Sequence, residues 1–176
     1  QKAEEHFNEM VQAGIKPSVS TYVLLVNAFA RDANVEKASE YWARIREMNQ
    51  RPPIQAFASM VQVHAKAGDV DKAEDFLMQM LQRYPAGKSQ LNSRWFAMLM
   101  DAHARTGDFE RCEALLETMQ KHGIAPNRVT YNTAMKARVN AGDLAGAEHW
   151  FKAMENSGNL KPDVYSHYTL FFGLVK

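Results

Sequence analysis

The sequence repeats itself about every 35 residues, and this periodicity limits the possible folds more than any other feature. Each copy contains a small residue, a large apolar residue four positions later and a Met-like residue three positions after that. Successive copies are 35, 35, 39 and 35 residues apart. The three positions are occupied by Ala3, Phe7 and Met10, by Ala38, Trp42 and Ile45, by Ala73, Leu77 and Met80, by Cys112, Leu116 and Met119, and by Ala147, Phe151 and Met154. Because residues i, i+4 and i+7 share one face of an α-helix, every copy predicts an amphipathic helix.

A second periodic apolar run precedes this helix in four of the copies and predicts another helix. The runs begin at Tyr22, Phe57, Phe96 and Tyr131. A short turn separates the two helices, because Gly can end a helix and Asp or Asn can cap the next one. These turns are Ala33-Asn34, Gly68-Asp69, Gly107-Asp108 and Gly142-Asp143. Each repeat is therefore predicted to be a helical hairpin made of a first and a second helix, and segments containing Pro separate the hairpins.

The hairpins are expected to stack, because a single hairpin of this size buries only one of its sides. The chain is thus predicted to be all-α, a single α-solenoid of helix-turn-helix repeats over residues 1–176. The repeat that ends at residue 92 carries four extra residues around 84–88. Since neither end has a polar capping helix, we expect the natural protein to continue in both directions. The predicted boundaries are a half repeat at 1–18, full repeats at 19–53, 54–92, 93–127 and 128–163, and a half repeat at 164–176.

Composition excludes several functional classes. No apolar run approaches the roughly 20 residues that a membrane span needs, so membrane insertion is not expected. A single cysteine, Cys112, is incompatible with an internal disulfide framework or a multi-cysteine zinc site. The sequence contains no catalytic motif, so we predict no catalytic residue, no cofactor, no metal and no enzymatic activity. The net charge of +1 is low for a dedicated nucleic-acid binder.

Some residues that could suggest chemistry have simpler interpretations. The methionines of the second helices fall at helical spacing and are predicted to be core residues rather than soft-metal ligands. Cys112 takes the place of a small residue and is expected to be buried and inert. His64 and His103 occupy one repeat position, and we expect them to pack rather than bind metal.

Two stretches carry a resemblance to a known family. Residues 129–163 read VTYNTAMKARVNAGDLAGAEHWFKAMENSGNLKPD, and residues 11–18 read VQAGIKPS. The Thr-Tyr-Asn-Thr start, the Ala-Gly-Asp turn and the Gly-x-x-x-Pro-Asp finish make the whole chain resemble the pentatricopeptide repeat family. A tetratricopeptide array is the nearest alternative, but its small first-helix residue is replaced here by Val26, Val61, Met100 and Met135. The resemblance implies a right-handed superhelix.

The resemblance further implies that the first helices bind single-stranded RNA, one nucleotide per repeat. In the family, the fifth and last residues of a repeat select the base, and the second residue packs against it. Asn132 and Asp163 would then read a base that Val129 and Tyr165 enclose, and the Asn132 amide fits uracil. Other last-position residues that could contribute are Ser18, Asn92 and Asn127, and Arg94 is the corresponding stacking residue of its repeat. The other fifth positions are apolar: Val23, Ala58 and Ala97.

Basic residues concentrate in the predicted first helices and their entries, which contain seven basic and two acidic side chains. Arg31, Lys66 and Arg105 fall at one equivalent position and are predicted to contact phosphates, although ordinary solvated charges remain the alternative. Asn140 interrupts this row in the next repeat, where Arg138 lies close in sequence and is predicted to substitute for it.

Two functions of different classes remain open. The chain is expected to be a single-stranded RNA-binding module of a mitochondrial or chloroplast protein that acts in processing, stability, editing or translation of organellar transcripts. The alternative is a scaffold that binds protein or ribosomal RNA inside a large assembly such as a mitoribosome, which the apolar fifth positions favour. DNA is not an expected partner.

Overall fold

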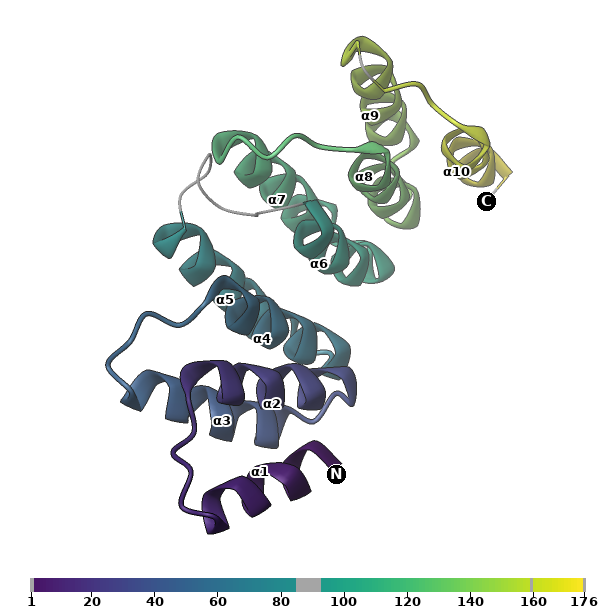
Figure 1. Ribbon diagram of the computed structural model, residues 1–176. Coiled ribbons are helices and arrows are strands. Elements are labelled where there is room, and N and C mark those ends of the chain that lie inside the picture. The colour runs from purple at the N-terminus through teal and green to yellow at the C-terminus, as the bar shows by residue number, and fades with distance from the viewer. Residues whose placement is uncertain (1, 85–92, 159, 176) are drawn as a thin grey trace. The chain divides into compact units, whose positions relative to one another are not determined.

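A computed structural model of the chain describes residues 2–84, 93–158 and 160–175, and its regular secondary structure is helical throughout (Figure 1). The predicted all-α fold of helical hairpins is therefore confirmed. The described helices are α1 (Lys2–Gln12), α2 (Val19–Arg31), α3 (Val35–Glu47), α4 (Ile54–Ala67), α5 (Val70–Arg83), α6 (Ser93–Thr106), α7 (Phe109–Lys121), α8 (Arg128–Asn140), α9 (Leu144–Asn156) and α10 (Val164–Val175). None of them is both long and apolar enough to cross a membrane.

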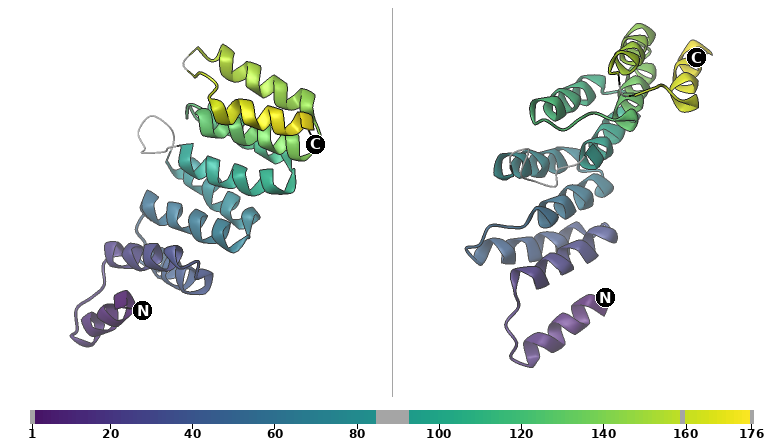
Figure 2. Two further views of the ribbon diagram at one scale, coloured as in Figure 1. Left: turned by 90° about the vertical axis from the view of Figure 1, so that its right-hand side faces the viewer. Right: turned by 45° about the horizontal axis from the view of Figure 1, so that its top comes forward.

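The helices form two compact units, Gln1–Arg83 and Tyr84–Lys176. The division falls where the sequence carries its extra residues. In the first unit, α2 packs against its hairpin partner α3 and against α4, the next first helix (Figure 1). In the second unit, α8 packs in the same way against α9 and lies between α6 and α10, as the right-hand view of Figure 2 shows. Within each unit, equivalent first helices are thus direct neighbours.

Short polar side chains cap the N-termini of three helices, as the turn sequences predict. Asn34, Asp108 and Asp143 each accept a hydrogen bond from a backbone N–H in the first turn of the helix that follows. The residue before each cap adopts a positive φ, which Gly supplies at little cost at Gly107 (75°) and Gly142 (79°). Ala33 adopts the same conformation (φ 54°) in the first turn, where a side chain makes it less favourable.

The repeating small and Met-like residues form the core from the second copy onward, as predicted, whereas in the first copy Ala3 is exposed and Met10 is half-buried because no described helix packs on the outer side of α1. Ala38, Ala73, Cys112 and Ala147 have no exposed surface, and neither do Ile45, Met80, Met119 and Met154. The Cys112 thiol lies in this column and donates to the backbone oxygen of Met100 at 3.2 Å. Burial of the thiol agrees with its interpretation as a structural residue.

The two equivalent histidines are also buried, each beside the aspartate of its turn. The Nδ1 atom of His64 lies 3.6 Å from a carboxylate oxygen of Asp69, and that of His103 lies 3.8 Å from Asp108. The His64 ring stacks on Phe76 with centroids 5.4 Å apart. Both histidines therefore pack in the core, as expected.

The environment of His64 predicts a loss of stability in mild acid. Burial lowers the pKa of His64 below its ordinary value of 6.5, and Asp69 offsets only part of this shift. The unfolded chain then binds a proton at His64 more readily than the folded chain does. The folded state is therefore most stable above pH 6.5, the ordinary pKa of histidine, and it loses stability as the pH falls below that value. We expect Tm to decrease between about pH 7.5 and about pH 5.5, a range in which histidine titrates. His64→Gln, which cannot titrate, should show a smaller decrease, and an equal decrease would contradict the assignment.

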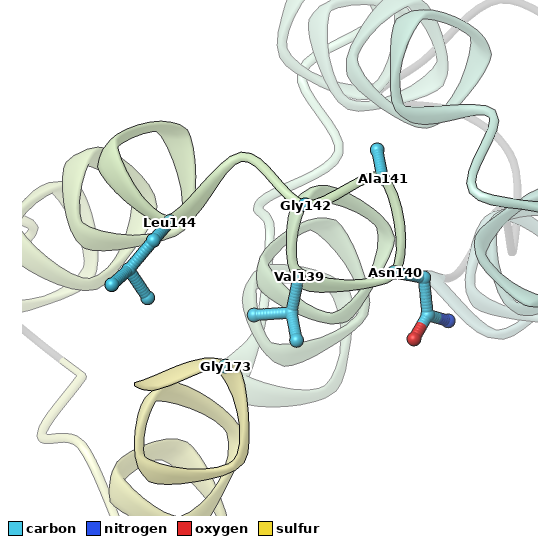
Figure 3. A pocket seen from close by; sticks show the side chains of 6 residues that line it. All are labelled: Val139, Asn140, Ala141, Gly142, Leu144 and Gly173. Atoms are coloured by element: carbon cyan, nitrogen blue, oxygen red, sulfur yellow. The ribbon is translucent and has the colours of Figure 1, made fainter. Parts of the chain in front are cut away.

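Close packing fixes the end of α10 against the hairpin before it. A Cβ atom at Gly173 would lie 3.0 Å from a methyl group of Val139 and 3.1 Å from one of Leu144. Figure 3 shows Gly173 below the Val139 side chain, while Asn140 points away. The hollow here has a volume of about 340 Å³ and is lined by Val139, Asn140, Ala141, Gly142, Leu144 and Gly173. It contains no charged side chain and none of the predicted site residues, so its role is packing.

Candidate nucleic-acid interface

The starts of α8 and α10 border a hollow of about 480 Å³, which we call the Asn132 hollow. It is lined by Ala97, Asp101, Arg128, Val129, Asn132, Thr133, Asp163 and Tyr165. The four residues predicted to hold one base, Val129, Asn132, Asp163 and Tyr165, therefore line the same hollow although they come from two repeats. Their role in binding stays a prediction.

Two apolar side chains are exposed on the walls of the hollow. Val129 is 58% exposed at the start of α8, and Tyr165 is 52% exposed at the start of α10. Single exposed apolar side chains are common on protein surfaces, so it is the position of these two on one hollow that points to a binding site. Their exposure leaves an apolar face available for a planar group.

The polar groups of the hollow are joined by hydrogen bonds. Asn132 is only 7% exposed, and its Oδ1 atom accepts from the Ser166 hydroxyl at 2.8 Å. The same hydroxyl lies 3.0 Å from Oδ1 of Asp163, and that oxygen also accepts from the Ser166 backbone N–H at 3.0 Å. Among the described residues, the Asn132 amide nitrogen makes no hydrogen bond. The amide is thus held by its oxygen and retains free N–H groups.

The carboxylate of Asp163 is kept ionised by its partners. The hydrogen bond from the Ser166 backbone N–H lowers the pKa of Asp163, and the Arg128 guanidinium, 3.3 Å away, adds to this effect. Asp163 therefore acts only as an acceptor near neutral pH.

A second carboxylate, that of Asp101, forms ion pairs with two basic side chains at the hollow. Lys136 Nζ lies 3.1 Å from one Asp101 oxygen, and Arg105 Nη2 lies 2.6 Å from the other. Burial raises the pKa of Asp101, but the hydrogen bonds from Lys136 and Arg105 outweigh it and the pKa is lowered overall. Arg105 is one of the predicted phosphate contacts, and 73% of its side chain is exposed.

The other two members of the predicted phosphate row lie in the first compact unit. Lys66 Nζ donates to the backbone oxygen of Arg31 at 2.9 Å, which ties the end of α4 to the end of α2. Asn140 makes the corresponding contact in the second unit, since its amide donates to the backbone oxygen of Ala104 at 2.7 Å. This repeat position therefore joins successive first helices, and Lys66 has a structural contact as well as an exposed position.

Arg138 does not lie at the Asn132 hollow. Its guanidinium donates to both carboxylate oxygens of Glu113 at 2.7 Å and to Asp143 at 2.6 Å. The group also lies 4.0 Å from the ring centroid of Phe109, and only 21% of the side chain is exposed. The structure thus places Arg138 in a network with α7 and the start of α9, and we do not retain it as a phosphate contact.

The remaining predicted residues have mixed positions. The Asn127 side chain caps α8 and donates to Ser93 Oγ at 2.6 Å, while Ser18 caps α2 in a reciprocal pair with Thr21. Both side chains are therefore engaged in helix capping. Arg94 is exposed near the start of α6. Asn92 lies outside the described residues.

Among the residues of the hollow or its support that sequence reasoning missed are Asp101, Arg128 and Ser166. A signal existed for two of them, because Asp101–Lys136 and Arg128–Asp163 are opposite charges 35 residues apart. Residues one period apart meet when equivalent helices are neighbours. Ser166 was visible only as the third residue after a helix-capping aspartate, and that pattern says nothing of its contact with Asn132.

Comparison with family models matches most of the chain. The PPR repeat family matches residues 92–138, the pentatricopeptide repeat domain matches residues 6–67, and the PPR repeat matches residues 56–84 and 129–159. A comparison with curated protein sequences gives no significant match.

Solved structures show the same fold. The pentatricopeptide repeat protein PPR10 from maize is 30% identical with a TM-score of 0.66, and the alignment covers 96% of this chain and 23% of that one. PPR10 in complex with an 18-nt psaJ RNA element is 21% identical with a TM-score of 0.56, covering 98% of this chain and 29% of that one. The PPR domain of Arabidopsis thaliana protein-only RNase P 1 in complex with tRNA is 12% identical with a TM-score of 0.80. The alignment covers 99% of this chain and 90% of that one. The chain thus spans about a quarter of the length of PPR10.

Proposed function

Because the chain belongs to the pentatricopeptide repeat family, we propose that it binds single-stranded RNA through the first helices of its repeats. The observation that carries the proposal is the Asn132 hollow, which an amide and a carboxylate line together with two exposed apolar side chains. We further propose that the whole protein acts on organellar transcripts in a mitochondrion or chloroplast.

A base in this hollow would be bound by stacking on its faces and by hydrogen bonds to its pairing edge. Val129 and Tyr165 would contact its two faces, and one stacking contact contributes about 1–3 kcal/mol. The Asn132 amide would donate to a carbonyl oxygen and accept from a ring N–H, which matches the pairing edge of uracil. One such polar contact discriminates between bases by about 1–3 kcal/mol, so a single site selects a base but not a transcript.

The phosphates would meet exposed basic side chains of the first helices. Arg105 and Arg128 are the candidates in the second compact unit, and Arg31 and Lys66 in the first. Their neighbouring carboxylates Asp101 and Asp163 reduce the local positive charge. We therefore expect weak binding with a modest dependence on salt.

Binding to oligouridylate at several salt concentrations tests the proposal. The three contacts of the predicted row, Arg31, Lys66 and Arg105, give a slope of about −2 for log K against log salt, because a single strand releases about 0.7 counterions per contact. We expect oligouridylate to bind more tightly than oligoadenylate of the same length, as measured by fluorescence anisotropy. A chain that binds neither at low salt would contradict the proposal.

The scaffold function remains the second candidate, and one observation favours it. The fifth positions Val23, Ala58 and Ala97 offer no polar group to a base edge, and Val23 is itself buried. Failure to bind oligonucleotides, together with retained folding, would favour this function.

A further inference from the structure

One buried hydroxyl connects the two residues that we propose to select the base. Ser166 has no exposed surface and does not line the Asn132 hollow. Its oxygen lies 2.8 Å from Asn132 Oδ1 and 3.0 Å from Asp163 Oδ1, and it accepts from the Asp163 backbone N–H at 3.2 Å. Among the described residues no hydrogen bond joins Asn132 to Asp163 directly, and Ser166 connects them.

The hydroxyl has a single proton to share between these two oxygens. When Asn132 receives it, the amide oxygen is held toward Ser166. When Asp163 receives it, the Ser166 oxygen can only accept from Asn132, and the amide is held with its nitrogen inward. In the structure Asn132 Oδ1 accepts from this hydroxyl at 2.8 Å, so the first arrangement is the one present and the amide nitrogen is directed away from Ser166.

Amide orientation matters because pyrimidine edges differ in symmetry. The edge of uracil presents an acceptor on each side of its ring N–H, so either orientation of an amide finds a complementary pair. The edge of cytosine presents a donor followed by two acceptors, so only one orientation matches it. A fixed amide can therefore reject cytosine, whereas an amide that turns freely accepts both bases.

We propose that Ser166 is a positioning residue that fixes the Asn132 amide and makes the site distinguish uracil from cytosine. This inference rests on the proposed function. It acts from behind the hollow without touching the base. The last residue of the repeat, Asp163, then influences the base through Ser166 rather than by contact with it.

The preceding repeat offers a matched comparison. Thr130 is the equivalent residue, is likewise without exposed surface, and forms the same reciprocal cap with Asn127. The corresponding fifth position is Ala97, which has no polar group, and the Thr130 hydroxyl donates to the Asn127 backbone oxygen at 2.8 Å. The hydroxyl at this position thus takes part in a helix cap in both repeats. Of the two, Ser166 is the one whose hydroxyl also contacts a residue that we propose to select the base.

The test measures dissociation constants for oligouridylate and oligocytidylate of equal length with the wild-type chain, Ser166→Ala, Ser166→Thr and Thr130→Ala. We expect Ser166→Ala to reduce the preference for uridine over cytidine by about fivefold, as the loss of one neutral hydrogen bond implies. Ser166→Thr keeps the hydroxyl and should restore the preference. Thr130→Ala should lower Tm as Ser166→Ala does, because both lose a cap, but should leave the preference unchanged.

The outcomes separate this inference from the function on which it rests. A wild-type chain that binds no RNA would overturn both. A wild-type chain that binds both oligonucleotides equally, or a Ser166→Ala variant with an unchanged preference, would overturn the inference alone. A preference that falls equally in Thr130→Ala would also overturn it, since the effect would then be one of helix capping.

Discussion

Tyr165→Ala is expected to weaken oligouridylate binding by about tenfold to a hundredfold, because it removes one stacking platform worth about 1–3 kcal/mol. Tyr165 is 52% exposed, so its truncation should change Tm little. The loss should appear in the dissociation constant measured by fluorescence anisotropy at low salt, where binding is tightest.

Two variants control for this prediction. Tyr165→Phe keeps the aromatic ring and should bind like the wild-type chain. Val164→Ala removes an adjacent side chain that is 86% exposed and does not line the hollow, and should also have no effect. Wild-type affinity in Tyr165→Ala, or an equal loss in Val164→Ala, would show that the hollow does not receive a base.

Arg138→Met is expected to destabilise the second compact unit by about 2–4 kcal/mol, a loss between those of exposed and of fully buried ion pairs. The substitution leaves Glu113 without its two guanidinium bonds, although Trp150 still donates to it at 2.6 Å. Asp143 also loses its ion pair with the guanidinium. The change should be measured as the free energy of unfolding in urea.

A surface ion pair provides the matched control. Arg44 lies 3.3 Å from Glu47, and more than half of each side chain is exposed. Arg44→Met should therefore cost less than about 1 kcal/mol. Equal losses for the two variants would contradict the assigned role of Arg138. Since Arg138 lies away from the Asn132 hollow, folded Arg138→Met should bind RNA like the wild-type chain, whereas a phosphate contact would predict weaker binding.

Periodicity was sufficient to predict the helical hairpins and most of the core. Small and Met-like residues at one helical spacing can only face inward when hairpins stack, and Ala73 and Met80 are buried as that argument requires. The resemblance to the family, rather than the repeat length, grouped Asn132 with Asp163, which line one hollow.

The contacts of individual side chains could not be predicted in the same way. Arg138 was expected near Asn140, but residues two positions apart point to nearly opposite sides of a helix. Its position toward α7 depends on Glu113, which lies 25 residues away. The link from Ser166 to Asn132 likewise depends on how two neighbouring helices are set against each other, which the repeat length leaves open.

The carboxylate of Asp101 has a consequence for any polyanion that approaches. Arg105 and Lys136 are already occupied by an internal anion, attached to the same chain and therefore always at high local concentration. A nucleic acid must displace this built-in competitor before it gains either cation. On the proposed function, we therefore expect Asp101 to weaken binding that rests on charge alone more than binding that also places a base in the adjacent hollow.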